Sequence, residues 1–118
     1  PPKKFSPPGK STKLAEFIGI MLGDGHLDPG SWSITLNSIA DKLYIPYVIN
    51  LVEKVFNVKS HIFIDKKDHT TVIYYYSVLF SKYLQSIGLK IGNKVKQQVG
   101  VPEWIWKNRN LAMNALKD

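Results

Sequence analysis

The chain contains no cysteine, and Arg109 is its single arginine. Without cysteine it can form neither disulfide bonds nor a zinc site built on thiolates. No apolar run approaches the roughly 18 residues of a membrane-spanning helix. The N-terminus "PPKKFSPPGKSTK" also lacks the hydrophobic core of a signal peptide. These absences favour an intracellular protein, cytoplasmic or organellar.

Acidic residues are scarce relative to basic ones. The 16 lysine and arginine residues against 9 aspartate and glutamate residues leave a net charge of +7. Such a surplus attracts polyanions through electrostatic steering and through release of their counterions, and it therefore favours a nucleic-acid partner. Many small basic proteins bind no polyanion, so the charge by itself does not assign a function.

The length and composition fit one packed domain, because 118 residues with 44% hydrophobic content are too few for two ordinary domains. Residues 1–11 are rich in proline and lysine, and they are expected to form a flexible arm because they cannot bury enough apolar surface to order themselves. The domain is expected to span residues 12–118.

Hydrophobic spacing predicts the secondary structure from Thr12 onward. A first helix is expected from Thr12 to Gly23–Gly25, with Ser11 or Thr12 as its N-cap. The elements expected after it are strands at 26–28 and 31–37, a helix at 41–57, strands at 58–65 and 70–77, a helix at 79–87, a helical turn opened by Pro102 and a helix from about Asn108. This order predicts an α+β fold of αββαββα type with an antiparallel sheet.

The helix at 41–57 is expected to bury one stripe of apolar side chains. Pro46 is tolerated only close to a helix start, so the ordered helix is expected to begin at about Ile45. The expected stripe comprises Leu43, Tyr47, Val48, Leu51, Val52, Val55 and Phe56.

The first predicted helix carries a line of small residues and ends in a carboxylate. Ala15, Gly19 and Gly23 are four residues apart, which places them on one side of a helix. Asp24 follows at the C-terminus, where unpaired carbonyls make a carboxylate unfavourable unless a cation compensates. A hard divalent cation bound by the Asp24 carboxylate and the Gly23 carbonyl satisfies that need. The alternative is that Gly25 is an ordinary C-cap and Asp24 a solvated surface residue.

One carboxylate cannot hold a catalytic pair of metal ions, but a second chain would bring another. A symmetric contact along the small-residue line would place two copies of Asp24 at one end of a helix pair. The residues expected at this dimer interface are Ala15, Ile18, Gly19, Leu22 and Gly23. The alternative is that this line packs the helix against its own domain.

The segment "FIGIMLGDG", residues 17–25, resembles the LAGLIDADG motif of homing endonucleases, and the predicted αββαββα order is similar to one repeat of that family. In this resemblance Gly19 matches the first glycine of the motif, Gly23 its alanine, Asp24 its metal-binding aspartate and Gly25 its final glycine. Leu22 replaces an earlier aspartate. The resemblance implies double-strand DNA cleavage with magnesium or another divalent cation at the minor groove, under a curved sheet that lies over the major groove.

The polar sides of the predicted strands are the candidate DNA-binding surface, because short polar side chains bond to base edges or to ordered water. The alternative is an ordinary solvated sheet face. With one arginine, the bidentate arginine contact to guanine is almost unavailable. The candidate DNA-binding residues are Ser33, Thr35, Asn37, Ser38, Lys59, His61, Thr71, Tyr75, Lys90 and Arg109. Thr71 and Tyr75 are the expected exposed set of the last strand, which is apolar on both faces.

The family resemblance also implies a lysine near the scissile phosphate, in the region before the last helix. Lys94 is the first candidate for this catalytic role and Lys96 the second. The alternative is that both lysines only anchor phosphates or keep the protein soluble.

These observations lead to a homing endonuclease acting on double-stranded DNA as a homodimer, in the setting of intron or intein mobility. A non-cleaving relative, an RNA maturase or a regulator, is the second hypothesis, and a protein-binding module is the third. The closing "NRNLAMNALKD" resembles the start of a second motif helix, so one half of a longer two-repeat enzyme is a further possibility.

Overall fold

A computed structural model describes residues 11–92 and contains three helices and a four-stranded sheet in this range. The predicted α+β class and the αββαββα order are confirmed. In chain order the elements are α1 Thr12–Asp24, β1 Gly25–Asp28, β2 Ser31–Asn37, α2 Tyr44–Phe56, β3 His61–Asp65, β4 Thr70–Tyr76 and α3 Val78–Ser86. The predicted arm at 1–10, the turn at Pro102 and the helix from Asn108 lie outside the described residues.

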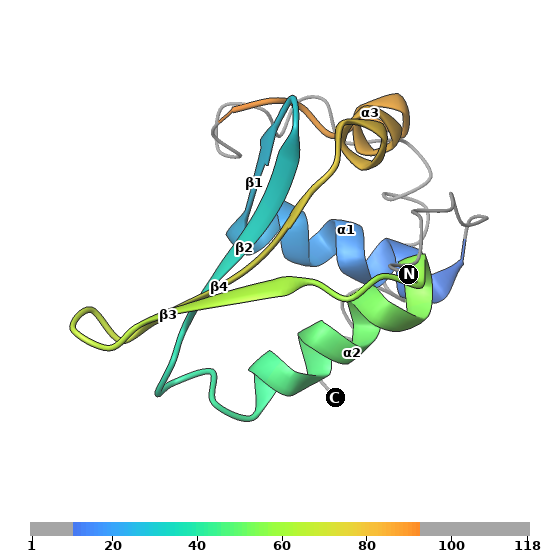
Figure 1. Cartoon of the computed structure of the whole chain (residues 1–118). Coiled ribbons are helices and arrows are strands. Elements are labelled where there is room, and N and C mark those ends of the chain that lie inside the picture. Colours follow the sequence, from blue (N-terminus) through green and yellow to red (C-terminus); the bar gives the residue numbers. More distant parts are fainter. Residues whose placement is uncertain (1–10, 93–118) are drawn as a thin grey trace.

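The sheet is antiparallel throughout, in the order β1-β2-β4-β3. The two central strands, β2 and β4, come from different hairpins, so the two αββ units share one continuous sheet. Figure 1 shows α1, α2 and α3 on one side of this sheet, while no helix of the described chain covers the opposite face. No helix within residues 11–92 is long and apolar enough to cross a bilayer.

Four aromatic rings join the helices to the sheet. Phe17 of α1 lies edge-on to Trp32 of β2, with ring centroids 5.4 Å apart, and to Phe56 of α2 at 4.8 Å. Phe80 of α3 contacts Trp32 at 5.5 Å and Phe56 at 4.5 Å. All four side chains are fully buried. Such edge-on pairs add to the free energy that burial of aromatic area already contributes, so this cluster holds all three helices on one face of the sheet.

The helix ends follow the capping signals in the sequence. The Ser11 hydroxyl accepts a hydrogen bond from the Leu14 N–H at 3.1 Å, which confirms Ser11 as the N-cap of α1. Ser77 caps α3 in the same way through the Phe80 N–H at 3.0 Å. At the end of α2, Asn57 adopts a left-handed conformation with φ of 57°, which closes the helix where glycine is more usual.

The predicted start of α2 at about Ile45 is confirmed, but two members of its predicted buried stripe were wrong. The helix begins at Tyr44, and the residues before it form turns in which the Asn37 side chain accepts from two backbone N–H groups and the Asp41 side chain accepts from the Asn37 N–H. These local bonds replace a first helical turn. Leu43 is consequently 89% exposed, and Tyr47 is also exposed rather than part of the buried stripe. The other predicted members are buried or partly buried against the core.

The turn from α1 into β1 depends on a close backbone approach at Gly25. A Cβ atom built at Gly25 would lie 2.6 Å from the Met21 Cα and carbonyl oxygen and 2.7 Å from its sulfur. The φ of Gly25 is −98°, which any residue can adopt, so the requirement for glycine is steric and not conformational. The strand can follow the helix directly only because this residue has no side chain.

Replacing the two neighbouring glycines tests this constraint. Gly25→Ala is expected to lower the free energy of unfolding by about 1–3 kcal/mol, the usual cost of overpacking against fixed backbone. Gly23→Ala is the matched control, because a Cβ there meets nothing within 4 Å and lies in a helix. It should leave stability unchanged or raise it by up to about 1 kcal/mol. Urea unfolding of both variants measures the difference, and equal effects would contradict the steric account.

Candidate nucleic-acid interface

The uncovered side of the sheet, called the open face below, is defined by strand register. Across it His26 pairs with Ser33, Ser33 with Tyr74, and Tyr74 with His61. Residues directly opposite one another in antiparallel strands project from the same face. The open face therefore comprises His26, Asp28, Ser31, Ser33, Thr35, Asn37, His61, Phe63, Asp65, Thr70, Val72, Tyr74 and Tyr76.

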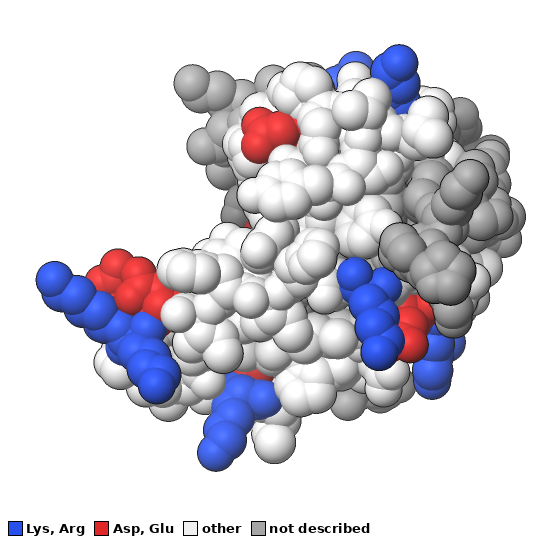
Figure 2. Space-filling model, viewed as in Figure 1, with Lys and Arg blue, Asp and Glu red and all other residues white. Residues whose placement is uncertain are grey.

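The open face is hollowed. A concavity of about 520 Å³ is lined by Asp28, Ser31, Trp32, Ser33, Phe63, Val72, Tyr74 and Tyr76. Figure 2 shows the molecule indented between its upper part and the projecting β3–β4 hairpin, and the visible surface of the indentation is mostly uncharged. Charged side chains of both signs gather at the hairpin tip, which contains Lys66 and Lys67 beside Asp65 and Asp68. The floor of the hollow thus carries a single carboxylate, that of Asp28, and its edge carries charges of both signs.

The predicted DNA-facing residues of β2 lie on the open face. Ser33 is half-buried and Thr35 and Asn37 are exposed, while Trp32, Ile34 and Leu36 between them are buried, as the alternation predicts. The Asn37 amide oxygen accepts from the N–H groups of Ile39 and Ala40 at 2.9 and 2.8 Å, so this side chain also holds the turn that follows. Its amide nitrogen is the part left to face a ligand.

The prediction for β4 was wrong. Thr71 is only 3% exposed, and its hydroxyl bonds to that of Ser38 at 2.7 Å. Tyr75 packs against the core, with its ring 5.7 Å from that of Phe80. The residues of β4 that do face outward are Thr70, Val72, Tyr74 and Tyr76. Sequence reasoning missed Tyr74 and Tyr76, because each face of "TTVIYYYS" carries an aliphatic and an aromatic residue and no polar alternation reveals the phase. It also missed Phe63 of β3, whose neighbours Ile62 and Ile64 are apolar too.

Two histidines lie on the open face. His26 Nε2 is 3.0 Å from Asp28 Oδ1, and both side chains are about half exposed. His61, a predicted DNA-binding residue, is exposed and lies 5.4 Å from the Tyr74 ring. Lys59 is exposed just before β3, and Lys90 is exposed after α3. The strand predicted at 58–65 begins only at His61, so Lys59 lies outside it.

The basic surplus is unevenly distributed along the chain. Residues 11–92 hold 8 lysines and 7 acidic residues, a net charge of +1, whereas residues 1–10 and 93–118 together hold 8 basic and 2 acidic residues, a net charge of +6. Lys94, Lys96 and Arg109 belong to this second group and lie outside the described residues. Any strong attraction for a polyanion must therefore draw on these terminal segments as well as on the open face.

Asp24 is the last residue of α1, and its side chain is exposed beside Gly23, which is also exposed. No group of three or more histidine, cysteine or acidic side chains capable of holding a metal ion occurs within residues 11–92. One chain thus contributes a single carboxylate at this position. That donor set fits a divalent cation only if further ligands come from elsewhere, as a shared site requires.

The residues of the predicted dimer interface differ in how far they are exposed to solvent, and therefore to a second chain. Ala15 and Ile18 are fully buried within the chain, so no second chain can reach them in this structure. Gly19 and Leu22 are half-buried and Gly23 is exposed. The accessible part of the small-residue line is therefore its C-terminal half, next to Asp24.

A polar cluster links α1 to α2 through Glu16, Tyr44 and Tyr47. The Glu16 side chain is buried and accepts a hydrogen bond from the Tyr47 hydroxyl, and the Tyr47 ring stacks on Tyr44 with centroids 5.9 Å apart. The Tyr44 hydroxyl is buried with no hydrogen-bond partner among the described residues. Burial, reinforced by the negative charges of Glu16, Tyr47, Asp24 and Asp41, raises the pKa of Tyr44 to about 12.

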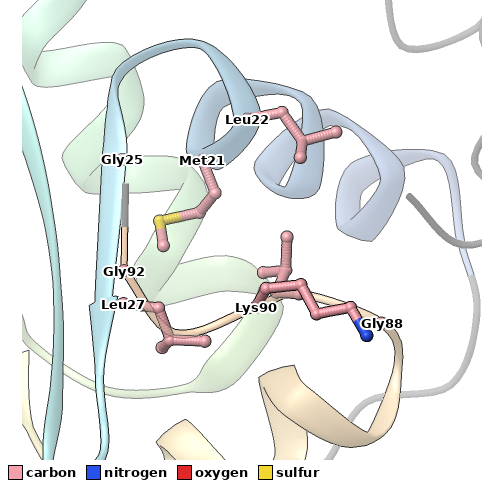
Figure 3. A pocket seen from close by; sticks show the side chains of 8 residues that line it. Met21, Leu22, Gly25, Leu27, Gly88, Lys90 and Gly92 are labelled. Carbon is pink, nitrogen blue, oxygen red and sulfur yellow. The ribbon is translucent and has the colours of Figure 1, made fainter. Parts of the chain in front are cut away.

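The chain after α3 returns to the junction of α1 and β1. The Gly92 N–H donates to the Leu27 carbonyl at 3.1 Å. A small pocket of about 20 Å³ lies between these segments, and in Figure 3 the Met21 and Leu27 side chains point into it while the Lys90 amino group extends toward Gly88. This volume holds about one water molecule and no larger ligand. The hydrogen bond between Gly92 and Leu27 brings residues 88–92 close to the C-terminal end of α1.

Comparison with known proteins identifies a distant relative but assigns no family. No protein-family model matches the chain. Over 107 residues the chain is 31% identical to the replication factor C small subunit of Methanocaldococcus jannaschii. This match covers 88% of the chain but only 6% of that protein, so the chain spans a small part of the relative's length.

The raised pKa of Tyr44 predicts a loss of stability in alkali. Folding favours the neutral phenol, so its contribution is fully present below the ordinary pKa of 10.0 and is lost as pH rises toward about 12. In Tyr44→Phe the free energy of unfolding should fall less steeply over this range. At neutral pH the same variant should be at least as stable as the parent, because it removes a buried hydroxyl that has no partner within residues 11–92.

Urea unfolding at a series of pH values measures both effects. Tyr76→Phe is the matched control, because Tyr76 is exposed and its hydroxyl stays in solvent. Identical slopes for Tyr44→Phe and the parent protein between pH 10 and 12 would contradict the assignment.

Proposed function

We propose that the chain is a site-specific endonuclease for double-stranded DNA, of the homing-endonuclease type, with Asp24 at its catalytic centre. The observation that carries the proposal is the position of Asp24, an exposed carboxylate at the C-terminus of the motif helix. A carboxylate at this end of a helix faces unpaired carbonyl groups and gains most from a bound cation. The confirmed αββαββα order supports the resemblance that assigns this role.

The open face is the proposed surface for the DNA duplex. It is uncovered by any helix of residues 11–92 and carries Ser33, Thr35 and Asn37 in a row along β2. Short hydroxyl and amide groups bond to base edges in the major groove, directly or through water. Since residues 11–92 contain no arginine, sequence selectivity would come from these groups and from DNA shape.

Magnesium or another divalent cation is the proposed cofactor, held by the Asp24 carboxylate and the Gly23 carbonyl. The bound ion would supply Lewis-acid activation of the attacking water and stabilise the leaving oxygen. Lys94 and Lys96 remain the candidates for the charge near the scissile phosphate. They follow Gly92 by two and four residues in the sequence, and Gly92 is bonded to the strand that succeeds Asp24.

A second carboxylate would come from a homodimer or from a second repeat in a longer parent protein. The accessible half of the small-residue line lies next to Asp24, so a contact centred on Gly23 would bring the two carboxylates together. The relative named for replication supports the mobile-element setting. A mobile element inserted in a host gene adds to the host protein a segment that does not serve that protein's named activity. A match limited to 6% of a protein that is named for another activity fits such an insertion. Access to DNA places the proposed activity inside the cell, in the cytoplasm or an organelle.

Asp24→Asn tests the catalytic role. With magnesium and a library of randomised duplex sites, the parent protein should release cut products. Asp24→Asn should slow cleavage by roughly two orders of magnitude or more, since metal stabilisation of the transition state is worth several kcal/mol. Sequencing of the ends from a timed digest measures both the rate and the site.

Asp68→Asn is the control for loss of one negative charge, because Asp68 is exposed in the β3–β4 turn and should leave cleavage intact. Steeply salt-dependent duplex binding by a parent protein that never cuts, with magnesium or manganese, would favour the non-cleaving maturase or regulator instead.

Gly23→Leu tests the shared site. A Cβ at Gly23 meets nothing within 4 Å in the single chain, so the variant should fold normally. If the helices pair there, the bulky side chain should convert a dimer into a folded monomer in light scattering. Asn50→Leu, an exposed position on α2, should remain dimeric. A parent protein that is already monomeric would reject the homodimer and leave the second repeat as the source of the other carboxylate.

A further inference from the structure

The open face carries aromatic side chains that duplex recognition does not use. Tyr76 is 72% exposed and Phe63 is 57% exposed, and the Tyr74 and Tyr76 rings lie edge-on with centroids 5.3 Å apart. Exposed apolar side chains that lie together, rather than singly, mark a surface that binds a partner. A paired duplex hides the flat faces of its bases, so it offers these rings nothing to stack on.

These rings form one side of the 520 Å³ hollow, whose other side is polar. Ser31 pairs with Tyr76 across the β2–β4 ladder, and Ser33 pairs with Tyr74. Asp28 lies beside Ser31 on β1. The volume falls within the roughly 300–1,000 Å³ that is typical of small-ligand sites, which combine an apolar wall with a few polar groups that fix orientation.

We propose that this hollow binds unpaired nucleobases of single-stranded nucleic acid. A base stacks on the ring of Tyr76 or Phe63, and its edge meets the hydroxyl groups of Ser31 and Ser33. The Asp28 carboxylate accepts a hydrogen bond from an exocyclic amine, as acidic side chains do with cytosine. Stacking on aromatic side chains of an open sheet is the usual way in which proteins hold unpaired bases.

Charge favours a nucleic acid over another occupant. The whole chain carries +7. At the hairpin tip beyond Phe63, Lys66 and Lys67 lie between Asp65 and Asp68, and the two lysines can contact the phosphate backbone of a strand that leaves the hollow. A second copy of this chain would instead bring a like charge of +7 against the same surface. Cleavage is not required for this binding, so the proposal stands apart from the catalytic role of Asp24.

Fluorescence anisotropy of the full chain at one fixed salt concentration tests the proposal. The probes are an unstructured pyrimidine DNA strand, the same sequence as RNA, the fully paired DNA duplex, and that duplex with a bulge of unpaired bases. Both single strands and the bulged duplex should bind more tightly than the paired duplex. A preference between the DNA and RNA strands identifies the natural source of the bases.

Two substitutions locate the binding. Tyr76→Ala and Phe63→Ala should each weaken single-strand binding about 5- to 100-fold, the range expected for loss of one stacked base, with little change for the paired duplex. Tyr76→Phe should bind normally because it keeps the ring. Leu79→Ala removes an equally exposed apolar side chain from α3, outside the hollow, and should also bind normally.

The proposal is overturned if both alanine variants bind single strands like the parent protein, or if they weaken paired-duplex binding to the same extent. It is also overturned if Tyr76→Ala lowers the oligomeric mass, because the rings would then serve a contact between copies. Asp24→Asn should keep full single-strand affinity, so failure of cleavage and failure of this proposal give different results.

Discussion

The contact of Phe17, Trp32, Phe56 and Phe80 decides the layout of the described chain. These four rings come from α1, β2, α2 and α3, and each is fully buried. Because all three helices pack on one face of the sheet, the other face is left to solvent. That face carries the polar residues of β2 and the outward aromatic residues of β3 and β4. A short chain with a single apolar layer thus creates a broad open surface and places the end of α1 at its border.

The strands differ in how far the sequence determines their orientation. In β2, Trp32, Ile34 and Leu36 alternate with polar residues, so only one face can enter the core, and the prediction for this strand was confirmed. In β4 both faces are apolar, and the phase is set by pairing, since Ile73 lies opposite Ile34 in the ladder. No property of "TTVIYYYS" alone carries that information. The predicted burial of Leu43 was wrong because hydrogen bonds to the side chains of Asn37 and Asp41 form turns where the helix was expected.

In the candidate site, too, the sequence predicted the features that depend on local structure and missed those that depend on packing. The motif predicted the position of Asp24 at an exposed helix end, because helix length and the glycine after it are local properties. The burial of Ala15 and Ile18 depends on what packs around α1, which spacing does not reveal. Gly25 is the C-cap of α1, as its residue type suggested, but its φ of −98° is ordinary. Glycine is required there because the Met21 backbone, four residues earlier, excludes a Cβ.

The charge distribution separates affinity from selectivity. Residues 11–92 carry only +1, and the floor of the hollow is built from hydroxyl groups, aromatic rings and one carboxylate, so the open face by itself attracts a polyanion weakly. The terminal segments carry +6 and can supply phosphate contacts that act on any sequence. The terminal segments would then attract duplex and single-stranded nucleic acid alike, and the open face of the sheet would determine which of them binds more tightly. Loss of a terminal lysine should reduce the salt dependence of every complex, whereas loss of a floor residue changes which nucleic acid is preferred.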